Sequence, residues 1–191
     1  VITTGPMPGA GAPSASRFNI STLSPQTGYI TSSNCGGNFG YFLKKAGLDA
    51  LILQGQCETP TWIDIQNEKV IFHKADDIWG MSTSEVQTAL DEKMRQKNGR
   101  LRKTGKICIG PAGENLVLYA SIVSNDRVSG RGGTGAIMGW MRLKAVCAGG
   151  NKDVPVHDPE QMLAHSKKWF AYLRKHPLTA EQLPKFGTAG L

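Results

Sequence analysis

Residues 125–136 combine two arginines with four glycines and carry almost no other side-chain bulk. Glycine adopts positive φ angles and lets the backbone approach a ligand closely, so this run predicts tight turns rather than a long helix or strand. The guanidinium groups match phosphate oxygens, and the N-terminus of a following helix adds positive potential. The segment therefore predicts a turn-rich fold with an anion-binding loop, and a phosphorylated cofactor is the expected ligand.

The glycines at 130–135 also satisfy the pattern G-x-G-x-x-G, which is found in dinucleotide-binding folds. Such folds need a strand directly before the first glycine, a helix after it and an acid about twenty residues further on. Here six residues, 124–129, separate the expected strand from Gly130, and the acid at that spacing, Asp153, falls in an expected loop. A nicotinamide-dependent dehydrogenase is therefore a less favoured alternative. A series of tight turns with two surface arginines is the structural alternative.

Composition places the chain among globular proteins and leaves few other classes open. Its 191 residues are 40% hydrophobic and 19% charged, and no run approaches the roughly 18 apolar residues of a membrane span. The net charge of +7 is concentrated in residues 93–106, which hold seven cations and no acid. Aromatic residues that could stack on bases are absent from that segment, so no nucleic-acid partner is expected.

The four cysteines stand at positions 35, 57, 108 and 147, too far apart for a C-x-x-C metal or cluster motif. Reduced thiols are then expected, which favours a cytoplasmic protein. Cys108 and Cys147 lie in apolar, strand-like runs and are predicted to be core residues.

Short apolar runs bounded by glycine and proline predict strands, and they come mostly in succession, which favours an α+β fold over a doubly wound sheet. The expected strands cover residues 1–4, 18–21, 29–32, 50–53, 61–65, 70–73, 106–109, 118–123 and 143–148. Helices are expected at residues 40–45, 83–96 and 136–141 and after Asp158. The helix at 83–96 has the strongest signal, because Ser82 and Glu85 have capping-box spacing.

Three further turns carry polar side chains next to expected strands. Residues 4–13 lead to Arg17, residues 33–37 contain Asn34, and residues 110–115 contain Glu114. Taken alone, an asparagine at the position of Asn34 is more often a helix cap. Glu114 has three possible interpretations: a catalytic acid, a cation ligand or, most favoured, a structural partner at a helix start. If these turns converge with residues 127–131, they form a polar cradle with a glycine floor.

The order of these segments resembles a known family. TGPMPGAGAPSASRFN, SSNCGGNFGYFLKKAGLDALILQG, DDIWG, IGPAGENLV, NDRVSGRGGTGAIMG and LPKFGTAG are similar, in this order along the whole chain, to the N-terminal domain of the aldehyde:ferredoxin oxidoreductase family. The resemblance implies two β-sheets with few helices, forming a base for a tungsten or molybdenum bis-pterin. It assigns residues 1–150 to this domain, with a short stretch expected to precede it, and residues 151–191 to the start of a helical domain.

The resemblance also implies the roles of individual residues. Arg17 matches an arginine between the pterin and an iron–sulfur cluster, and Asn34 and Gly36 match pterin contacts. A phosphate-binding loop corresponds to Arg127, Val128, Gly130 and Arg131. The backbone carbonyls of Asn34 and Val128 match ligands of a magnesium ion that bridges the two pterin phosphates.

The implied activity is oxidation of aldehydes to carboxylates, or the reverse, with electrons passed through a [4Fe–4S] cluster to ferredoxin or another carrier. The cluster ligands and the acid/base residues are expected outside this chain, so no catalytic residue is predicted in it and it should be inactive alone. A homodimer of the full-length protein is compatible with the family. A non-catalytic pterin-binding module or a gene remnant is the alternative.

Overall fold

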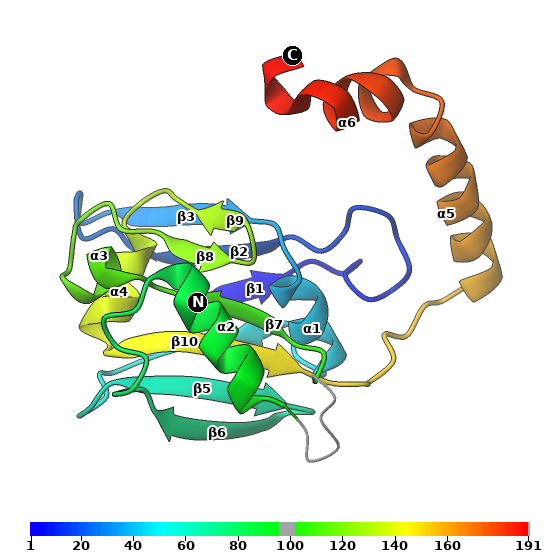
Figure 1. Ribbon diagram of the computed structural model, residues 1–191. Coiled ribbons are helices and arrows are strands. Elements are labelled where there is room, and N and C mark those ends of the chain that lie inside the picture. Colours follow the sequence, from blue (N-terminus) through cyan, green and yellow to red (C-terminus); the bar gives the residue numbers. More distant parts are fainter. Residues whose placement is uncertain (96–101, 191) are drawn as a thin grey trace.

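The computed structural model of the protein describes residues 1–95 and 102–190 (Figure 1). It contains two β-sheets, accompanied by several helices, in which strands mostly follow strands along the chain. The predicted α+β class with two sheets is confirmed.

The first sheet has four antiparallel strands and one face turned toward the core. In spatial order these are β3 (Ile30–Cys35), β2 (Phe18–Leu23), β1 (Ile2–Thr4) and β4 (Ala50–Leu51). Ile2, Phe18 and Ile20 are buried on the inner face, whereas Thr3 and Asn19 are only partly covered on the outer face. This alternation follows the two-residue period of a strand that is buried on one side.

The second sheet is larger and mixed. Its strands, in spatial order, are β6 (Lys69–Lys74), β5 (Thr61–Gln66), β10 (Leu143–Gly149), β7 (Gly105–Cys108), β8 (Ile122–Ser124) and β9 (Arg127–Ser129). β10 runs parallel to β5 and antiparallel to β7, and all seven of its residues are buried. A central strand covered on both faces explains its nearly continuous apolar sequence.

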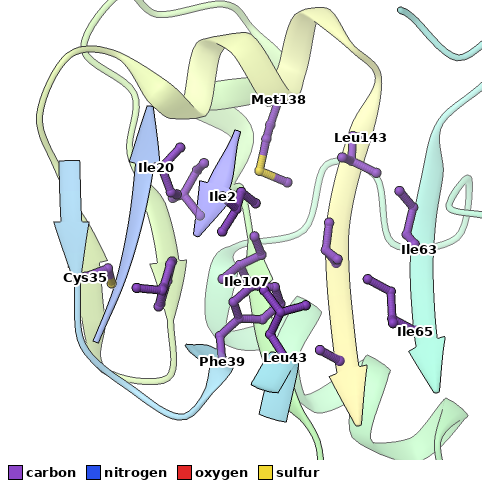
Figure 2. Packing of buried hydrophobic residues seen from close by; sticks show 14 of the residues in the cluster. Ile2, Ile20, Cys35, Phe39, Leu43, Ile63, Ile65, Ile107, Met138 and Leu143 are labelled. Atoms are coloured by element: carbon purple, nitrogen blue, oxygen red, sulfur yellow. The ribbon is translucent and has the colours of Figure 1, made fainter. Parts of the chain in front are cut away.

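Two apolar clusters cover the two faces of this second sheet. The larger cluster lies between the sheets, where Ile2 and Ile20 face Ile107 and Leu143 (Figure 2). The smaller cluster lies under α2 and includes Cys108 and Cys147, which confirms that both cysteines are core residues. Burial of each large side chain contributes about 1.5–3 kcal/mol, so these clusters are the main source of stability.

The helices are short except for two. They are α1 (Phe39–Lys45), α2 (Thr83–Lys93), α3 (Pro111–Glu114), α4 (Thr134–Trp140), α5 (Pro159–Leu173) and α6 (Leu183–Phe186). Ser82 and Glu85 form the predicted capping box of α2. α2 ends at Lys93, with Met94 at its C-cap, so the prediction that it continues to residue 96 was too long. Residue 96 itself lies outside the described residues, as does part of the basic segment 93–106.

The C-terminal helices extend away from the two sheets (Figure 1). The Asp158 side chain accepts a hydrogen bond from the Gln161 N–H and so caps α5, as its sequence predicts. Ser166 on α5 donates a hydrogen bond to the carbonyl oxygen of Gly11, at 3.1 Å. This contact ties α5 to the loop that leads to Arg17.

The prediction for residues 118–123 was largely wrong. The strand β8 begins only at Ile122, because the chain turns on itself after α3: Leu116 has φ +57°, and the Ala120 N–H bonds to the Val117 carbonyl. Residues 127–129, expected to be part of a loop, form the strand β9 and pair with β8. A run of three residues next to glycines carries too little periodicity to signal such a strand.

Candidate functional site

The candidate site lies where an edge strand of each sheet meets the other. β3 and β9 contact each other (Figure 1), and the turn before α1 lies beside them. A cleft of about 530 Å³ opens here. Its lining comes from three separate segments and consists of Ser14, Ser16, Arg17, Gly36, Gly37, Asn38, Asn125, Asp126 and Arg127.

The turn before α1 and the first turn of α1 itself support the two arginine-bearing segments. A Cβ atom on Gly40 would lie 2.8 Å from the carbonyl oxygen of Ser16 and 3.1 Å from that of Arg17. A Cβ on Gly36 would lie 3.5 Å from Cγ of Arg127, an ordinary contact distance. Glycine is thus required at position 40 for close backbone packing. At position 36 it leaves the cleft floor bare without being forced by a clash.

Arg17 is held by a neutral partner. Its Nε–H donates to the side-chain Oδ1 of Asn34, which lies in β3. The helix-cap reading of Asn34 was wrong, because the residue at the N-cap of α1 is Asn38. An amide oxygen orients the guanidinium without neutralising its charge.

Arg17 and Asn34 also line a second cavity of about 440 Å³. Its other walls come from residues 3–8, from Ser14 and Ala15, and from Phe18 and Asn19. Arg17 therefore lies between two cavities and can present its N–H groups to ligands on either side.

The arginines of this region have no acidic partner. Within residues 1–95 and 102–190, no carboxylate is within ion-pair distance of Arg17, Arg127 or Arg131. Asp126 lines the cleft but pairs with none of them. With two arginines and one aspartate in its lining, the cleft has a net positive charge and is suited to an anion.

Cys35 lies behind this cleft and is almost fully buried. Burial raises the pKa of its thiol, while the positive charges of Arg17 and Arg127 act in the opposite direction. The free thiol therefore stays protonated at neutral pH.

The remaining predicted residues lie beside the cleft rather than on its wall. Val128 is 52% exposed in β9, and the backbone N–H of Arg131 donates to Oγ of Ser33 at 3.2 Å. A Cβ on Gly130 would meet only atoms at 3.4 Å or more. The predicted residues are thus gathered around one junction, with Arg17, Gly36 and Arg127 lining the cleft itself.

The other glycines of residues 125–136 have a packing role. Gly132 and Gly133 have positive φ angles, and a Cβ on either would collide with Thr31 or with the carbonyl oxygen of Leu118. A Cβ on Gly135 would press into the backbone of Ala120 and Ser121. The hypothesis of tight turns therefore accounts for these three glycines. The hypothesis that glycine lets the backbone approach a ligand applies only to Gly130.

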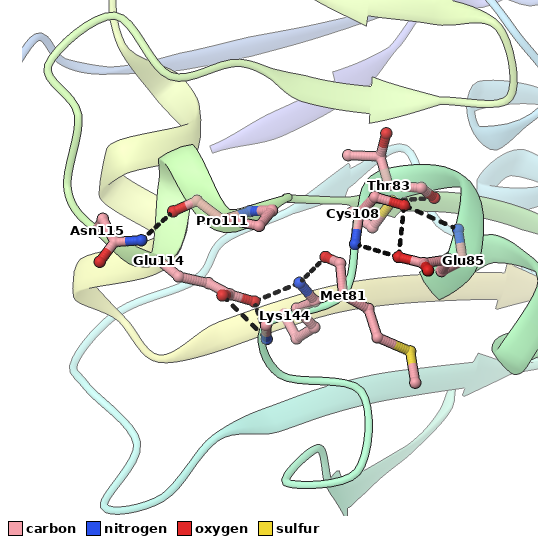
Figure 3. A network of polar contacts seen from close by, with 10 residues as sticks. Met81, Thr83, Glu85, Cys108, Pro111, Glu114, Asn115 and Lys144 are labelled. Atoms are coloured by element: carbon pink, nitrogen blue, oxygen red, sulfur yellow. Dashed lines mark hydrogen bonds and ion pairs between the residues drawn. The ribbon is translucent and has the colours of Figure 1, made fainter.

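Glu114 does not join the cleft, which corrects the expectation that four turns converge. Its carboxylate pairs with the buried ammonium of Lys144 and accepts the Gly80 N–H, at 3.0 Å to each oxygen (Figure 3). Lys144 also donates to the Met81 carbonyl at 2.9 Å. A structural role of Glu114 is confirmed, but not as a partner at a helix start: Glu114 ties α3 to β10 and to the loop before α2.

The topology also contradicts a dinucleotide fold. β9 leads through α4 to β10, but the intervening pairings β9–β8, β8–β7 and β7–β10 are all antiparallel, so β9 and β10 run in opposite directions. A dinucleotide-binding unit needs two parallel strands around its helix. The G-x-G-x-x-G match is therefore not the dinucleotide motif.

The sequence reasoning missed Ser14, Ser16 and Asn125 as cleft residues. Ser14 and Asn125 both have positive φ angles, of 56° and 53°. Asparagine and aspartate favour turns, so Asn-Asp between two short apolar runs could have identified Asn125 as a turn residue. The loop before Arg17 has no comparable signal.

Neither a metal-ligand cluster nor a membrane-spanning helix is found in the described part of the chain. No group of three or more His, Cys, Asp or Glu residues there could hold a metal ion. None of the helices in those residues is long and apolar enough to cross a membrane.

Comparisons with known proteins agree with the motifs. Residues 1–150 match the family described as "Aldehyde ferredoxin oxidoreductase, N-terminal domain". The "Tungsten-containing aldehyde ferredoxin oxidoreductase" of Thermococcus kodakarensis is 41% identical over 192 residues, covering all of this chain and 31% of that relative. The "Aliphatic sulfonate oxidoreductase, WOR-like subunit" of Pyrococcus furiosus is 34% identical over 171 residues, covering 85% of this chain and 27% of the relative.

A solved structure has a similar fold. It is the "Active site complex BamBC of Benzoyl Coenzyme A reductase in complex with 1,5 Dienoyl-CoA", with a TM-score of 0.86 and 31% sequence identity. The match covers 96% of this chain and 27% of that one. The chain spans about a third of the length of the curated relatives that it matches.

Proposed function

The chain belongs to the aldehyde ferredoxin oxidoreductase family, and from this premise we propose that its Arg17–Arg127 cleft binds the phosphate groups of a tungsten or molybdenum bis-pterin. The relative from Thermococcus kodakarensis is named as tungsten-containing, which supports tungsten as the metal. The proposed part played by this chain is to bind and orient the cofactor.

One observation carries this proposal: two arginines line a single cleft and no described carboxylate neutralises them. All eight ion pairs found among the described residues involve other cations. What distinguishes Arg17 and Arg127 is that both line the same cleft. Unpaired guanidinium groups around a glycine-floored cavity suit phosphate, which accepts paired N–H bonds. The residues present therefore fit a phosphorylated group.

In this proposal each residue has a physical role. Arg127 and Arg131 donate to phosphate oxygens, together with backbone N–H groups near Gly36 and Gly130. Arg17, oriented by Asn34, adds positive charge toward the expected cluster. Asn34 and Val128 lie on edge strands, where some backbone carbonyls lack a strand partner and are available to a magnesium ion.

When bound, the metal of the bis-pterin supplies the redox chemistry. In the longer protein we propose oxidation of an aldehyde or reduction of a carboxylic acid, with electrons passing through a [4Fe–4S] cluster to ferredoxin or a similar carrier. Residues 1–150 then form the cofactor-binding domain and residues 151–191 begin a helical domain. A cytoplasmic location and a homodimer belong to the same proposal.

The test is metal and pterin analysis of the full-length protein purified without oxygen. We expect tungsten or molybdenum with bound pterin, and loss of most of both in an Arg17→Ala/Arg127→Ala variant. Arg174→Ala/Lys175→Ala, which removes two exposed cations after α5, is the matched control and should keep its cofactor. A wild-type protein without metal and pterin, or a cleft variant that retains both fully, would contradict the proposal.

A further inference from the structure

The two-residue turn between β8 and β9 places Arg127 in the cleft. We propose that Asn125, in this turn, is a positioning residue: its side chain fixes the turn on α1 and so sets where Arg127 stands relative to Arg17. The inference rests on the proposed function in one respect, namely that the cleft recognises phosphate.

Hydrogen bonds tie Asn125 to two other elements. Its side-chain Oδ1 accepts the backbone N–H of Asn38, the N-cap residue of α1, at 3.2 Å. Its backbone carbonyl accepts a hydrogen bond from Nε2 of Gln87 on α2, at 3.3 Å. The turn is therefore held from both sides, by α1 through the side chain and by α2 through the backbone.

Close packing strengthens the attachment to α1. A Cβ on Gly37 would lie 2.8 Å from Oγ and 2.9 Å from the carbonyl oxygen of Ser124, and 3.2 Å from Oδ1 of Asn125. The turn thus rests directly on Gly37, just as the stem of Arg127 rests on Gly36. A shift of the turn would carry Arg127 with it.

The same short segment also supports the backbone of Arg17, through Gly40. The start of α1 is therefore a common platform on which both arginine-bearing segments are placed. No described carboxylate pairs with Arg127, and no hydrogen bond of its side chain is found among the described residues, so its position depends on its backbone. The Asn125–Asn38 hydrogen bond is the polar contact that fixes this backbone on the platform.

Asparagine combines the two properties that this position needs. Asn125 has φ +53°, a left-handed conformation that asparagine and glycine tolerate better than most residues. Unlike glycine, asparagine also provides a side-chain oxygen. Asn125→Gly therefore keeps the backbone conformation and removes only the attachment.

The chain offers a matched control in the turn between β5 and β6. Asn67 also has a positive φ, of 48°, and its Oδ1 accepts the Asn151 N–H at 3.1 Å. It does not line the cleft. Asn67→Gly makes the same chemical change elsewhere.

The experiment uses the full-length protein produced in a host that cannot synthesise the pterin, with pyrophosphate as the probe and titration calorimetry as the measurement. We expect Asn125→Gly to weaken pyrophosphate binding about tenfold, because Arg127 no longer has one fixed position. Asn67→Gly should bind within about twofold of wild type while losing a similar amount of thermal stability. If the wild type binds pyrophosphate, equal affinity of Asn125→Gly would overturn the inference.

Crystal structures of wild type and Asn125→Gly separate this inference from the proposed function. Displacement of the β8–β9 turn and of Arg127 in the variant supports the positioning role, even if the wild type does not bind pyrophosphate. A wild type that does not bind pyrophosphate would contradict phosphate recognition by the cleft, but not the positioning role of Asn125. An unmoved Arg127 in the variant would overturn the positioning role whatever the affinity.

Discussion

The Arg17–Arg127 cleft and the Lys144–Glu114 pair show two opposite uses of charge in one chain. Lys144 is fully buried, Glu114 is 5% exposed at its side chain, and each is the other's ion-pair partner. Arg17 and Arg127 line an open cleft and have no described acidic partner. A charge removed from water must be paired, whereas a charge kept at the surface can remain available for a ligand.

Polar residues beside glycine-rich turns therefore serve two different purposes in this chain. Glu114 and Arg17 both lie next to a strand in a turn of small residues. A structural role was favoured for Glu114 and the resemblance assigned Arg17 to the pterin, but the sequence does not show the partners of either side chain. Only the three-dimensional partners distinguish them. Removing the buried charge should affect stability, and removing the cleft charge should affect ligand binding.

The largest expected effect is on the buried pair. Glu114→Ala leaves the Lys144 ammonium without its partner inside the protein, so the free energy of unfolding should fall by about 3–5 kcal/mol. Urea unfolding of this chain, followed by circular dichroism, measures it. A Glu114→Leu/Lys144→Met variant removes both charges and should recover much of the loss. A fall below about 1 kcal/mol in Glu114→Ala would mean that the pair is not structurally important.

Glycines provide the next contrast. Gly133→Ala forces a Cβ into the Leu118 carbonyl at a positive φ, and should cost about 2–3 kcal/mol of stability. Gly130→Ala meets only ordinary contacts and should change stability by less than about 0.5 kcal/mol. The same urea unfolding compares the two variants. Equal losses would show that the turn packing is not as described.

Arg17→Ala should leave stability nearly unchanged but weaken anion binding. Loss of a charged hydrogen-bond donor should raise the dissociation constant for pyrophosphate about 10- to 100-fold, measured on the cofactor-free full-length protein. Arg174→Ala has the same change in net charge outside the cleft and is the control. An Arg17→Ala protein that unfolds more easily but binds pyrophosphate normally would reverse the comparison.

The smallest expected effect is a change of stability with pH, caused by the thiol of Cys108, whose pKa is influenced by Lys144. Burial raises the pKa of Cys108 from 9.0 to about 11, with Lys144 and Lys106 opposing that change. A raised pKa means that the buried thiol contributes stability below about pH 9, which is lost as the pH rises toward 11. The stability gap between wild type and Cys108→Ala should therefore narrow by about 1 kcal/mol from pH 8 to pH 10. A constant gap in urea unfolding at both pH values would contradict the assigned burial.

Much of the fold follows from local sequence. The capping box at Ser82, the cap at Asp158 and the apolar run of β10 each predicted their element, because each depends on neighbours within a few residues. β9 and the turn after Leu116 were missed, because strand pairing and a left-handed residue decide them and neither leaves a periodic pattern.

The candidate site was predictable only in part. Arg17, Asn34, Gly36 and residues 127–131 were identified through their order along the chain, and the structure brings them to one junction of the two sheets. Their binding roles remain predictions. The hydrogen bond between Asn125 and Asn38 and the burial of Glu114 against Lys144 could not be predicted, since the partners are 87 and 30 residues apart in the sequence.

A crystal structure of the full-length protein, purified without oxygen and with its cofactor bound, tests directly whether the cleft binds the pterin phosphates. We predict phosphate oxygens within hydrogen-bond distance, about 3 Å, of the Arg127 guanidinium, and pterin beside Arg17. A bound pterin whose phosphates lie away from both arginines, with the cleft filled by another part of the protein, would contradict the account.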